Sequence, residues 1–172
     1  MHVILVTLIV ISLALFAVTP IAQIHFSNQE MTRAGWREMV ERERTRADTH
    51  LEVVSAQAQN LAMTAVLRNV GTTKLADWSQ WDVIVQYYGL TGNLVICWLP
   101  SEAGNGRWWA VEGLYYDAEQ GQGEVFDLGT LNPGEEVKMR ITLSQPVAAG
   151  SLVSLTVVTP EGVRASTTLM AD

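Results

Sequence analysis

Residues 136–144 read Glu-Val-Lys-Met-Arg-Ile-Thr-Leu-Ser, and this stretch decides the fold of most of the chain. Apolar residues at 137, 139, 141 and 143 alternate with polar residues between them, which is the period-two pattern of a strand with one buried face. Residues 153–157 repeat the alternation, and Pro160-Glu-Gly162 predicts a tight turn into another strand. The two patterns together indicate an antiparallel β structure.

The same chemistry extends outward over the region from Leu51 to the C-terminus. Asn69-Val-Gly-Thr72 and Leu131-Asn-Pro-Gly134 are further turn signals between apolar runs. Short strands at this spacing predict two packed sheets of four or five strands each, an immunoglobulin-like β-sandwich. The expected strands are 51–58, 61–69, 81–88, 94–99, 107–116, 124–128, 136–144, 151–159 and 162–169.

The N-terminal part has a different pattern. The first 29 residues contain no Asp, Glu, Lys or Arg, and the apolar character runs from Val3 to Phe26. A helix that is apolar on all sides must be surrounded by lipid or protein, and residues 3–26 are long enough to span a bilayer. Residues 29–47 lack proline and continue the helix with mixed charge, and Pro20 is the expected kink.

The sequence therefore predicts an α+β chain with two parts. Residues 1–50 form a long hydrophobic N-terminal helix, and residues 51–172 form the all-β sandwich. Three roles compete for the helix. A cleaved secretory signal lacks its basic n-region and a small-residue cleavage site, and a plain membrane anchor lacks the usual basic flank. A mature filament subunit whose basic leader has been removed explains an apolar run that begins at the first residues.

Charge and composition exclude several classes of protein. Residues 1–50 hold five Arg and five acidic residues, so the net charge of −7 lies entirely in residues 51–172. An acidic domain argues against nucleic acid as a partner. The single cysteine, Cys97, lies in an apolar run and is expected to be a buried, inert thiol. His2, His25 and His50 all lie in or next to the helix, so the sandwich offers no histidine for catalysis.

Two remaining features suggest binding, and each also has a structural explanation. The acidic, glycine-rich segment 117–124 offers Asp117, Glu119 and Glu124 to Ca²⁺, although it is first of all a hairpin loop. Adjacent side chains in a strand point to opposite faces, so Trp108-Trp109 and Tyr115-Tyr116 each predict one inward and one outward ring. An outward ring suits either a sugar or a neighbouring subunit, and subunit contact is favoured. The candidate inter-subunit aromatics are Trp36, Trp78, Trp108 and Trp109.

The ordered set of segments resembles the archaellins and their relatives in the type IV filament superfamily. The segments are an apolar N-terminal helix, Leu51-Glu-Val-Val-Ser55, Leu67-Arg-Asn-Val-Gly-Thr-Thr72, Trp81-Asp-Val-Ile-Val85, Leu131-Asn-Pro-Gly-Glu135 and Val158-Thr-Pro-Glu-Gly-Val163. The chain departs from bacterial type IV pilins at position 5, where it has Leu5 in place of their usual Glu. It also departs from archaellins in having no glycine before Gly35.

This resemblance implies a structural, non-catalytic subunit of an extracellular filament for motility or adhesion, without cofactor or catalytic residues. Many copies would polymerise through their helices after passing through the membrane, with the help of a membrane-bound assembly machine. The alternative is a membrane-anchored accessory or binding protein of the same envelope machinery. The residues expected in a filament core are Val3, Leu5, Leu8, Ile9, Ile11, Leu13, Leu15, Phe16, Ile21 and Ile24.

Overall fold

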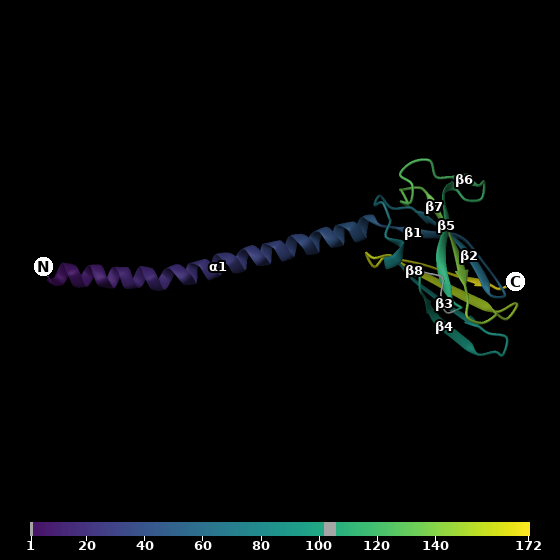
Figure 1. Ribbon diagram of the computed structural model, residues 1–172, viewed down its shortest axis with the longest axis horizontal. Helices are drawn as coiled ribbons and strands as arrows, with labels where there is room; N and C mark the ends of the chain where they lie inside the picture. The colour runs from purple at the N-terminus through teal and green to yellow at the C-terminus, as the bar shows by residue number, and fades with distance from the viewer. Residues whose placement is uncertain (1, 102–105) are drawn as a thin grey trace. The chain divides into compact units, whose positions relative to one another are not determined.

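The computed structural model describes residues 2–101 and 106–172, without the side chains of helix residues 2, 3, 5, 14, 15 and 17–29 (Figure 1). The chain divides into two compact units, Met1–Glu43 and Arg44–Asp172. The boundary lies inside the helix, so the last helical residues, 44–48, belong to the second unit.

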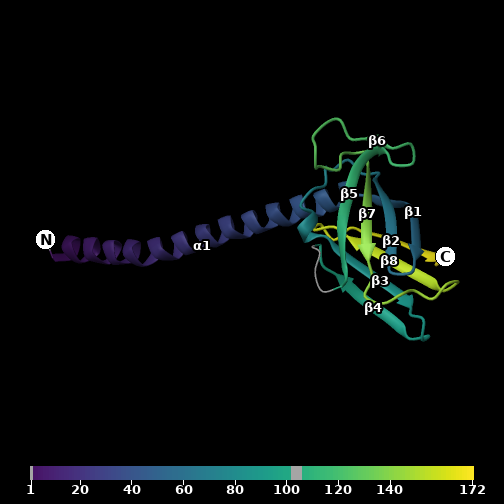
Figure 2. The same cartoon turned by 45° about the vertical axis from the view of Figure 1, so that its right-hand side comes forward.

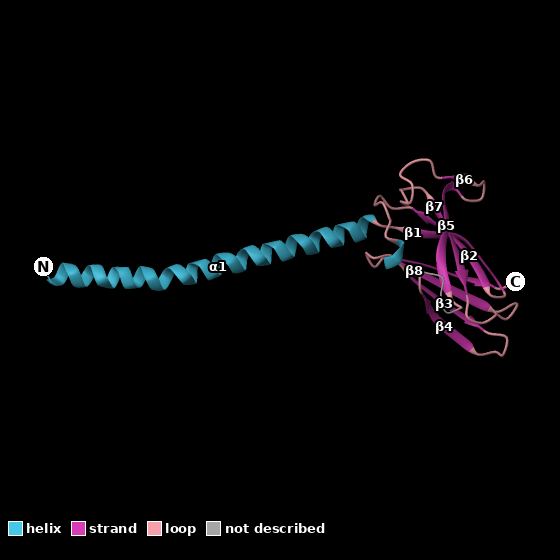
Figure 3. Cartoon of the chain, in the orientation of Figure 1, coloured by secondary structure: helices cyan, strands magenta, loops and turns pink. Residues whose placement is uncertain are grey.

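Helix α1 runs without interruption from His2 to Asp48, and Figure 3 shows it in cyan. Its apolar residues Leu8, Ile9, Ile11, Leu13 and Phe16 are between 49 % and 85 % exposed, so the described part of the first unit does not cover them. The other expected core positions, Val3, Leu5, Leu15, Ile21 and Ile24, and the side chain of Pro20 lie outside the described residues. A search of the described residues finds no helical stretch with the length and hydropathy that a bilayer crossing requires.

The second unit is a sandwich of two antiparallel sheets, which confirms the predicted fold (Figures 1 and 2). One sheet has five strands in the order β1-β2-β7-β5-β6, and the other has four in the order β4-β3-β8-β9. A short 3₁₀ turn, η1 (Trp78–Gln80), precedes β3. The strands are β1 (Leu51–Gln59), β2 (Ala62–Asn69), β3 (Asp82–Tyr88), β4 (Leu94–Leu99), β5 (Trp108–Asp117), β6 (Gln122–Gly123), β7 (Glu136–Thr142), β8 (Leu152–Val158) and β9 (Arg164–Met170).

The core lies between the two sheets and is built by the alternation seen in the sequence. Val137, Met139 and Ile141 of β7 are fully buried, as predicted, while Lys138 and Arg140 between them point to the outer face. Val83, Val85 and Tyr87 of β3 and alternate residues of β8 meet them from the opposite sheet. At about 25 cal/mol per Å² of apolar surface, this continuous core is the main source of the domain's stability.

The loop after β2 fixes the point where the chain leaves α1 and enters the sandwich. Asn69 is fully buried, and its side-chain amide donates to the carbonyls of Thr73 at 2.8 Å and Leu131 at 3.1 Å. Its Oδ1 accepts the N–H of Gly71 at 3.1 Å. The Asp48 carbonyl accepts the N–H of Thr72 at 2.8 Å and that of Thr73 at 3.3 Å, so N–H groups of this loop hold the helix end. The predicted turn at 69–72 thus fixes the position of residues 48–50, where the chain passes from the helix into the sandwich.

One predicted strand is wrong. Residues 124–128 form an irregular loop, and the strand that follows β5 is the two-residue β6, which ends just before this loop. The apolar run was misleading because Val125 is 92 % and Phe126 77 % exposed, so neither side chain packs on the core. Asp127 adopts a left-handed φ of 61°, which ends any extended conformation there. The other eight strands agree with the prediction to within about two residues, the usual uncertainty of strand ends.

Gly71 supplies a direct test of the helix-to-sandwich connection. A Cβ at this position would lie 2.5 Å from the Asp48 carbonyl oxygen and 2.5 Å from the His50 nitrogen, both backbone atoms. Gly71→Ala is therefore expected to lower the free energy of unfolding by about 1–3 kcal/mol, the usual cost of overpacking. Gly123→Ala is the matched control, because nothing lies within 4 Å of its added Cβ. Urea unfolding of both variants measures the difference, and equal stabilities would contradict the close approach.

Candidate functional site

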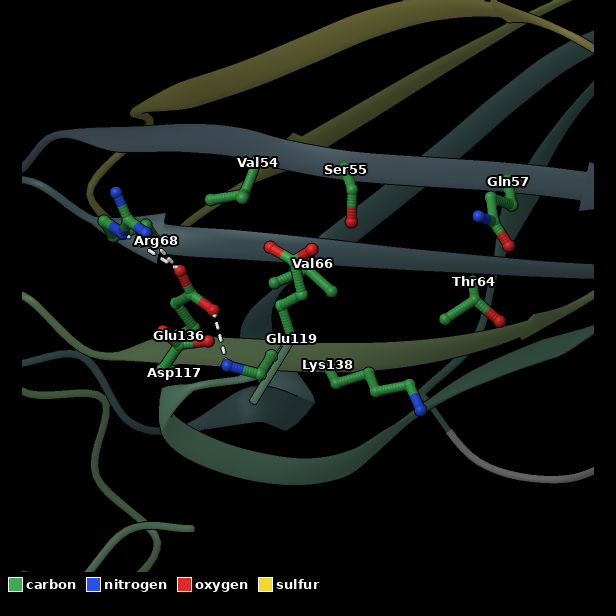
Figure 4. Close-up of a pocket in the computed structure, with 11 residues that line it drawn as sticks. Val54, Ser55, Gln57, Thr64, Val66, Arg68, Asp117, Glu119, Glu136 and Lys138 are labelled. Atoms are coloured by element: carbon green, nitrogen blue, oxygen red, sulfur yellow. Dashed lines mark hydrogen bonds and ion pairs between the residues drawn. The ribbon is translucent and has the colours of Figure 1, made fainter. Parts of the chain in front are cut away.

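A groove of about 450 Å³ lies on the outer face of the five-stranded sheet (Figure 4). Its floor comes from β1, β2 and β7, and the turn after β5 forms one wall. Most of its lining is polar, including Arg68, Glu136 and Lys138. In Figure 4 the Arg68 and Glu136 side chains meet at one end of the groove, and Lys138 points along it.

Glu136 is the unusual residue of this groove. It begins β7 on the outer face, where the alternation predicts a solvated side chain, yet it is only 2 % exposed. Arg68 donates to its Oε1 through Nε at 3.0 Å and also through Nη2, and the Ala118 N–H donates to Oε2 at 2.8 Å. A buried carboxylate is tolerated here because a charged partner and a backbone donor replace its water. The turn after β5 that buries it could not be placed from the sequence.

The polar side chains that line the groove are mostly paired with one another or with backbone groups. Both oxygens of Glu136 are occupied by its donors, so it is poorly placed to take a proton from a substrate. Lys138 pairs with Glu112 at 3.2 Å on the same sheet face. Ser55 is the hydroxyl that lines the groove on β1, and no histidine lines the groove beside it. The described groups therefore include no nucleophile with an adjacent base.

The acidic segment suggested for calcium does not form a metal site among the described residues, in which no group of three potential ligands gathers. Asp117 instead accepts the Gln120 N–H at 2.9 Å and closes the turn between β5 and β6. Glu124 accepts the Gly129 N–H at 3.2 Å, farther along the next loop. Both carboxylates cap backbone N–H groups, the ordinary role of acidic residues in turns.

The candidate aromatic residues have different environments. Trp109 is 1 % exposed and belongs to the core, so the suggestion that it contacts another subunit is corrected. Its neighbour Trp108 is half-buried, in keeping with opposite-facing side chains. Trp78 is also half-buried and packs on Trp81 with ring centroids 4.8 Å apart. Trp36 on α1 is 64 % exposed.

Sequence reasoning missed the most exposed tryptophan of the sandwich. Trp98 on β4 is 52 % exposed, and its indole N–H donates to Asp82 at 2.7 Å. It stands next to Cys97 in the apolar run 94–99, where only the cysteine was singled out from the sequence. The available signal was the alternation of the edge strand, in which Cys97 and Leu99 point inward and Trp98 must point outward.

Cys97 and the histidines do not supply chemistry to the groove. Cys97 is a free, buried thiol, as predicted, and contacts the Val85 carbonyl at 3.7 Å. Burial raises the pKa of this thiol, and the charge of Arg107 lowers it by less. His50 is exposed at the start of the sandwich, whereas the side chains of His2 and His25 lie outside the described residues.

Comparison with known proteins identifies the fold of the sandwich. No family model and no curated protein matches the chain. The archaellum periplasmic stator protein FlaG from Sulfolobus acidocaldarius matches with a TM-score of 0.52 and 24% identity, over 70% of this chain and 99% of that chain. A chain of the FlaF and FlaG stator complex from the same organism matches with a TM-score of 0.51 and 24% identity, over 69% and 87%.

The archaeal flagellum of Methanospirillum hungatei strain JF1 is similar with a TM-score of 0.45 and 13% identity, over 99% of this chain and 91% of that chain, a level that carries no argument. The two stator matches establish a shared sandwich fold. The archaellum setting of the predicted resemblance thus recurs among structural neighbours, whereas the specific relation to archaellins gains no support from them.

Arg68→Ala is expected to lower the free energy of unfolding by about 1–3 kcal/mol, because it leaves the buried Glu136 carboxylate without its charged partner. Arg140→Ala is the control, since its 3.7 Å contact with Glu112 is at the surface and is worth roughly 0–1 kcal/mol. Adding Glu136→Gln to Arg68→Ala should recover part of the loss, because an amide needs no counter-ion. Chemical denaturation measures all three, and a double variant no better than the single would contradict this account.

The burial of Cys97 predicts that the free energy of unfolding depends on pH. The raised pKa means that the folded protein keeps the thiol proton at pH values where the unfolded chain has lost it. The stabilisation is full below the ordinary thiol pKa of about 8.5 and is lost as pH rises through the folded value. Wild-type protein should therefore lose unfolding free energy above about pH 8.5 relative to Cys97→Ala. Parallel pH curves for the two proteins would show that the thiol is not desolvated.

Proposed function

We propose that this protein is a non-catalytic component of an archaellum-type machine in the cell envelope, retained there by α1 and carrying a sandwich that binds protein partners. The archaellum setting comes from the two stator structures whose fold the sandwich shares. The role itself rests on one observation, an apolar helix without cover that leads into a domain with no catalytic arrangement among its described residues. In this proposal the protein acts as an accessory, stator-like part rather than as the filament itself.

The exposed apolar side chains of α1 must be buried in lipid or against another protein. Ile4, Val6 and the apolar residues from Leu8 to Phe16 that the structure describes are about half to four-fifths exposed. Leaving such side chains in water costs about 1.5–3 kcal/mol each relative to burial. No described segment of the chain shields them. A lipid bilayer supplies that cover for a lone anchor, and the acidic sandwich is then held at the membrane surface without binding strongly to anionic lipid.

A filament subunit is the second candidate, and a separate feature of α1 favours it. Trp36, Met39 and Val40 are 58–64 % exposed and share a helix face at the spacing i, i+3, i+4. They follow the apolar segment by ten residues or more, so a bilayer around that segment does not reach them. Neighbouring helices in a bundle would cover both regions. The predicted extracellular location and polymerisation through α1 belong to this candidate.

Cell fractionation separates the two candidates. The accessory role predicts that the protein stays with membranes, is extracted only by detergent, and is absent from sheared surface filaments. Ile9→Asp should release it from membranes, because a carboxylate inside the apolar segment costs up to about 2.5–3.5 kcal/mol in a bilayer. Val40→Asp is the matched control and should leave membrane retention unchanged.

The opposite results identify the filament candidate. Recovery of the chain as the main component of sheared filaments would contradict the accessory role, especially if Val40→Asp also abolished those filaments. Recovery of the wild-type chain in the soluble fraction would contradict both, since neither lipid nor a helix bundle would then cover α1.

A further inference from the structure

The outer face of the four-stranded sheet is apolar and almost uncharged. Seven large side chains on it are between 36 % and 65 % exposed. They are Ile84 and Tyr88 of β3, Leu94, Ile96 and Trp98 of β4, Leu152 of β8 and Met170 of β9. We call this surface the β4 face. Asp82 and Arg164, at one end, are its charged residues.

Strand register gives the β4 face a definite pattern. Tyr88 pairs with Leu94, Leu152 pairs with Met170, and the β3–β8 register places Tyr88 beside Leu152. One row of bulky apolar side chains therefore crosses all four strands. A second bulky line runs along the edge strand β4, which Figures 1 and 2 show at the margin of the sheet. The remaining corner holds small hydroxyl side chains, Ser154, Thr156, Ser166 and Thr168.

The two outer faces of the sandwich are thus opposite in character. The outer face of the five-stranded sheet carries Arg68, Lys138, Arg140 and Glu112 and is well solvated. The β4 face belongs to the same acidic domain, yet three of its four rows contain no charge. Exposed apolar patches on monomeric proteins rarely exceed a few hundred Å², so this face requires a partner.

We propose that a second copy of this chain covers the β4 face, so that two sandwiches pack face to face about a two-fold axis parallel to the strands. The exposed apolar area of the β4 face is close to that of a standard protein interface. Seven side chains exposed by a third to two thirds offer on the order of 700 Å², close to the roughly 800 Å² that each partner contributes to a standard interface. A symmetric dimer uses this patch twice and leaves no copy of it in water.

The second argument is shape. A two-fold axis along the strands places β4 of one copy over β9 of the other. The bulky Ile96 and Trp98 then face the small Thr168 and Ser166. The polar Gln86 on β3 faces Ser154, a partner for its amide. Large side chains opposite small ones allow two sheets to pack at the usual separation of about 10 Å.

The third argument is charge complementarity. Asp82 pairs with Val158 and Val158 pairs with Arg164, so both charged residues lie in the same end row. The same two-fold axis brings Asp82 of each copy near Arg164 of the other, which gives two reciprocal ion pairs. Asp82 Oδ1 accepts the Trp98 N–H, and Oδ2 remains available for the guanidinium. A lipid surface does not offer paired charges at these two positions, whereas a second copy of the chain does.

Sedimentation equilibrium of the full-length chain in detergent, where micelles cover α1, tests the proposal. Wild-type protein is expected to dimerise. Ile96→Glu should raise the dimer dissociation constant at least about tenfold, because it buries an unpaired charge twice per dimer. Val125→Glu is the matched control: it adds the same charge at a 92 % exposed apolar residue off the β4 face and should change nothing. Circular dichroism and melting temperature confirm that both variants fold.

A charge exchange distinguishes self-association from any other occupant. Asp82→Arg and Arg164→Asp should each weaken the dimer, since each sets like charges opposite one another. The double variant should recover the wild-type dissociation constant, because reversal of both charges restores the reciprocal pairs. A wild-type monomer, a dimer insensitive to Ile96→Glu, or a double variant weaker than both singles would overturn the proposal. So would an Ile96→Glu effect confined to binding of lipid vesicles.

Discussion

The structure depends on the burial of alternate side chains between two sheets. In β7 the inward residues are fully buried and the outward ones are charged, so this central strand fixes which way the five-stranded sheet faces. A slip of one residue would place Lys138 and Arg140 in the core, at a cost far beyond the usual stability of a domain. The opposite sheet follows the same rule on its inner face. Its outer residues, however, are largely apolar instead of charged, and this apolar outer face is the basis of the proposed dimer.

An apolar outer face destabilises an isolated domain in water and promotes aggregation. Such a face on a folded protein therefore indicates a binding surface. The α1 helix presents the same situation on a larger scale, with apolar side chains that the chain itself does not cover. In the two proposals made above, both apolar surfaces are covered only when the protein meets a membrane or a partner. The acidic remainder of the sandwich keeps non-specific contacts weak, because copies repel one another except where the charge is absent.

The sequence was sufficient for the sandwich because alternation and turn signals are local. Gly162 and Gly134, both with positive φ, stand in turns that the sequence predicted. The prediction from sequence was wrong at 124–128, where apolar residues lie in an exposed loop. It also did not include the burial of Glu136, which the turn after β5 covers. Cys97 was placed correctly, whereas its neighbour Trp98 was not singled out, although the alternation about Cys97 points its ring outward. Trp109 remained a candidate contact because alternation predicts one inward and one outward ring for Trp108-Trp109 without telling which of the two is inward.

The central claim is that the β4 face meets another copy of itself. A photoreactive benzophenone amino acid at position 96, in the full-length protein within cells, tests it most directly, because irradiation captures whatever lies against that face. The account predicts a cross-linked homodimer whose adduct maps to β9, Arg164–Met170, of the second copy. An adduct with lipid or with a different protein, or no cross-linked homodimer at all, would contradict it.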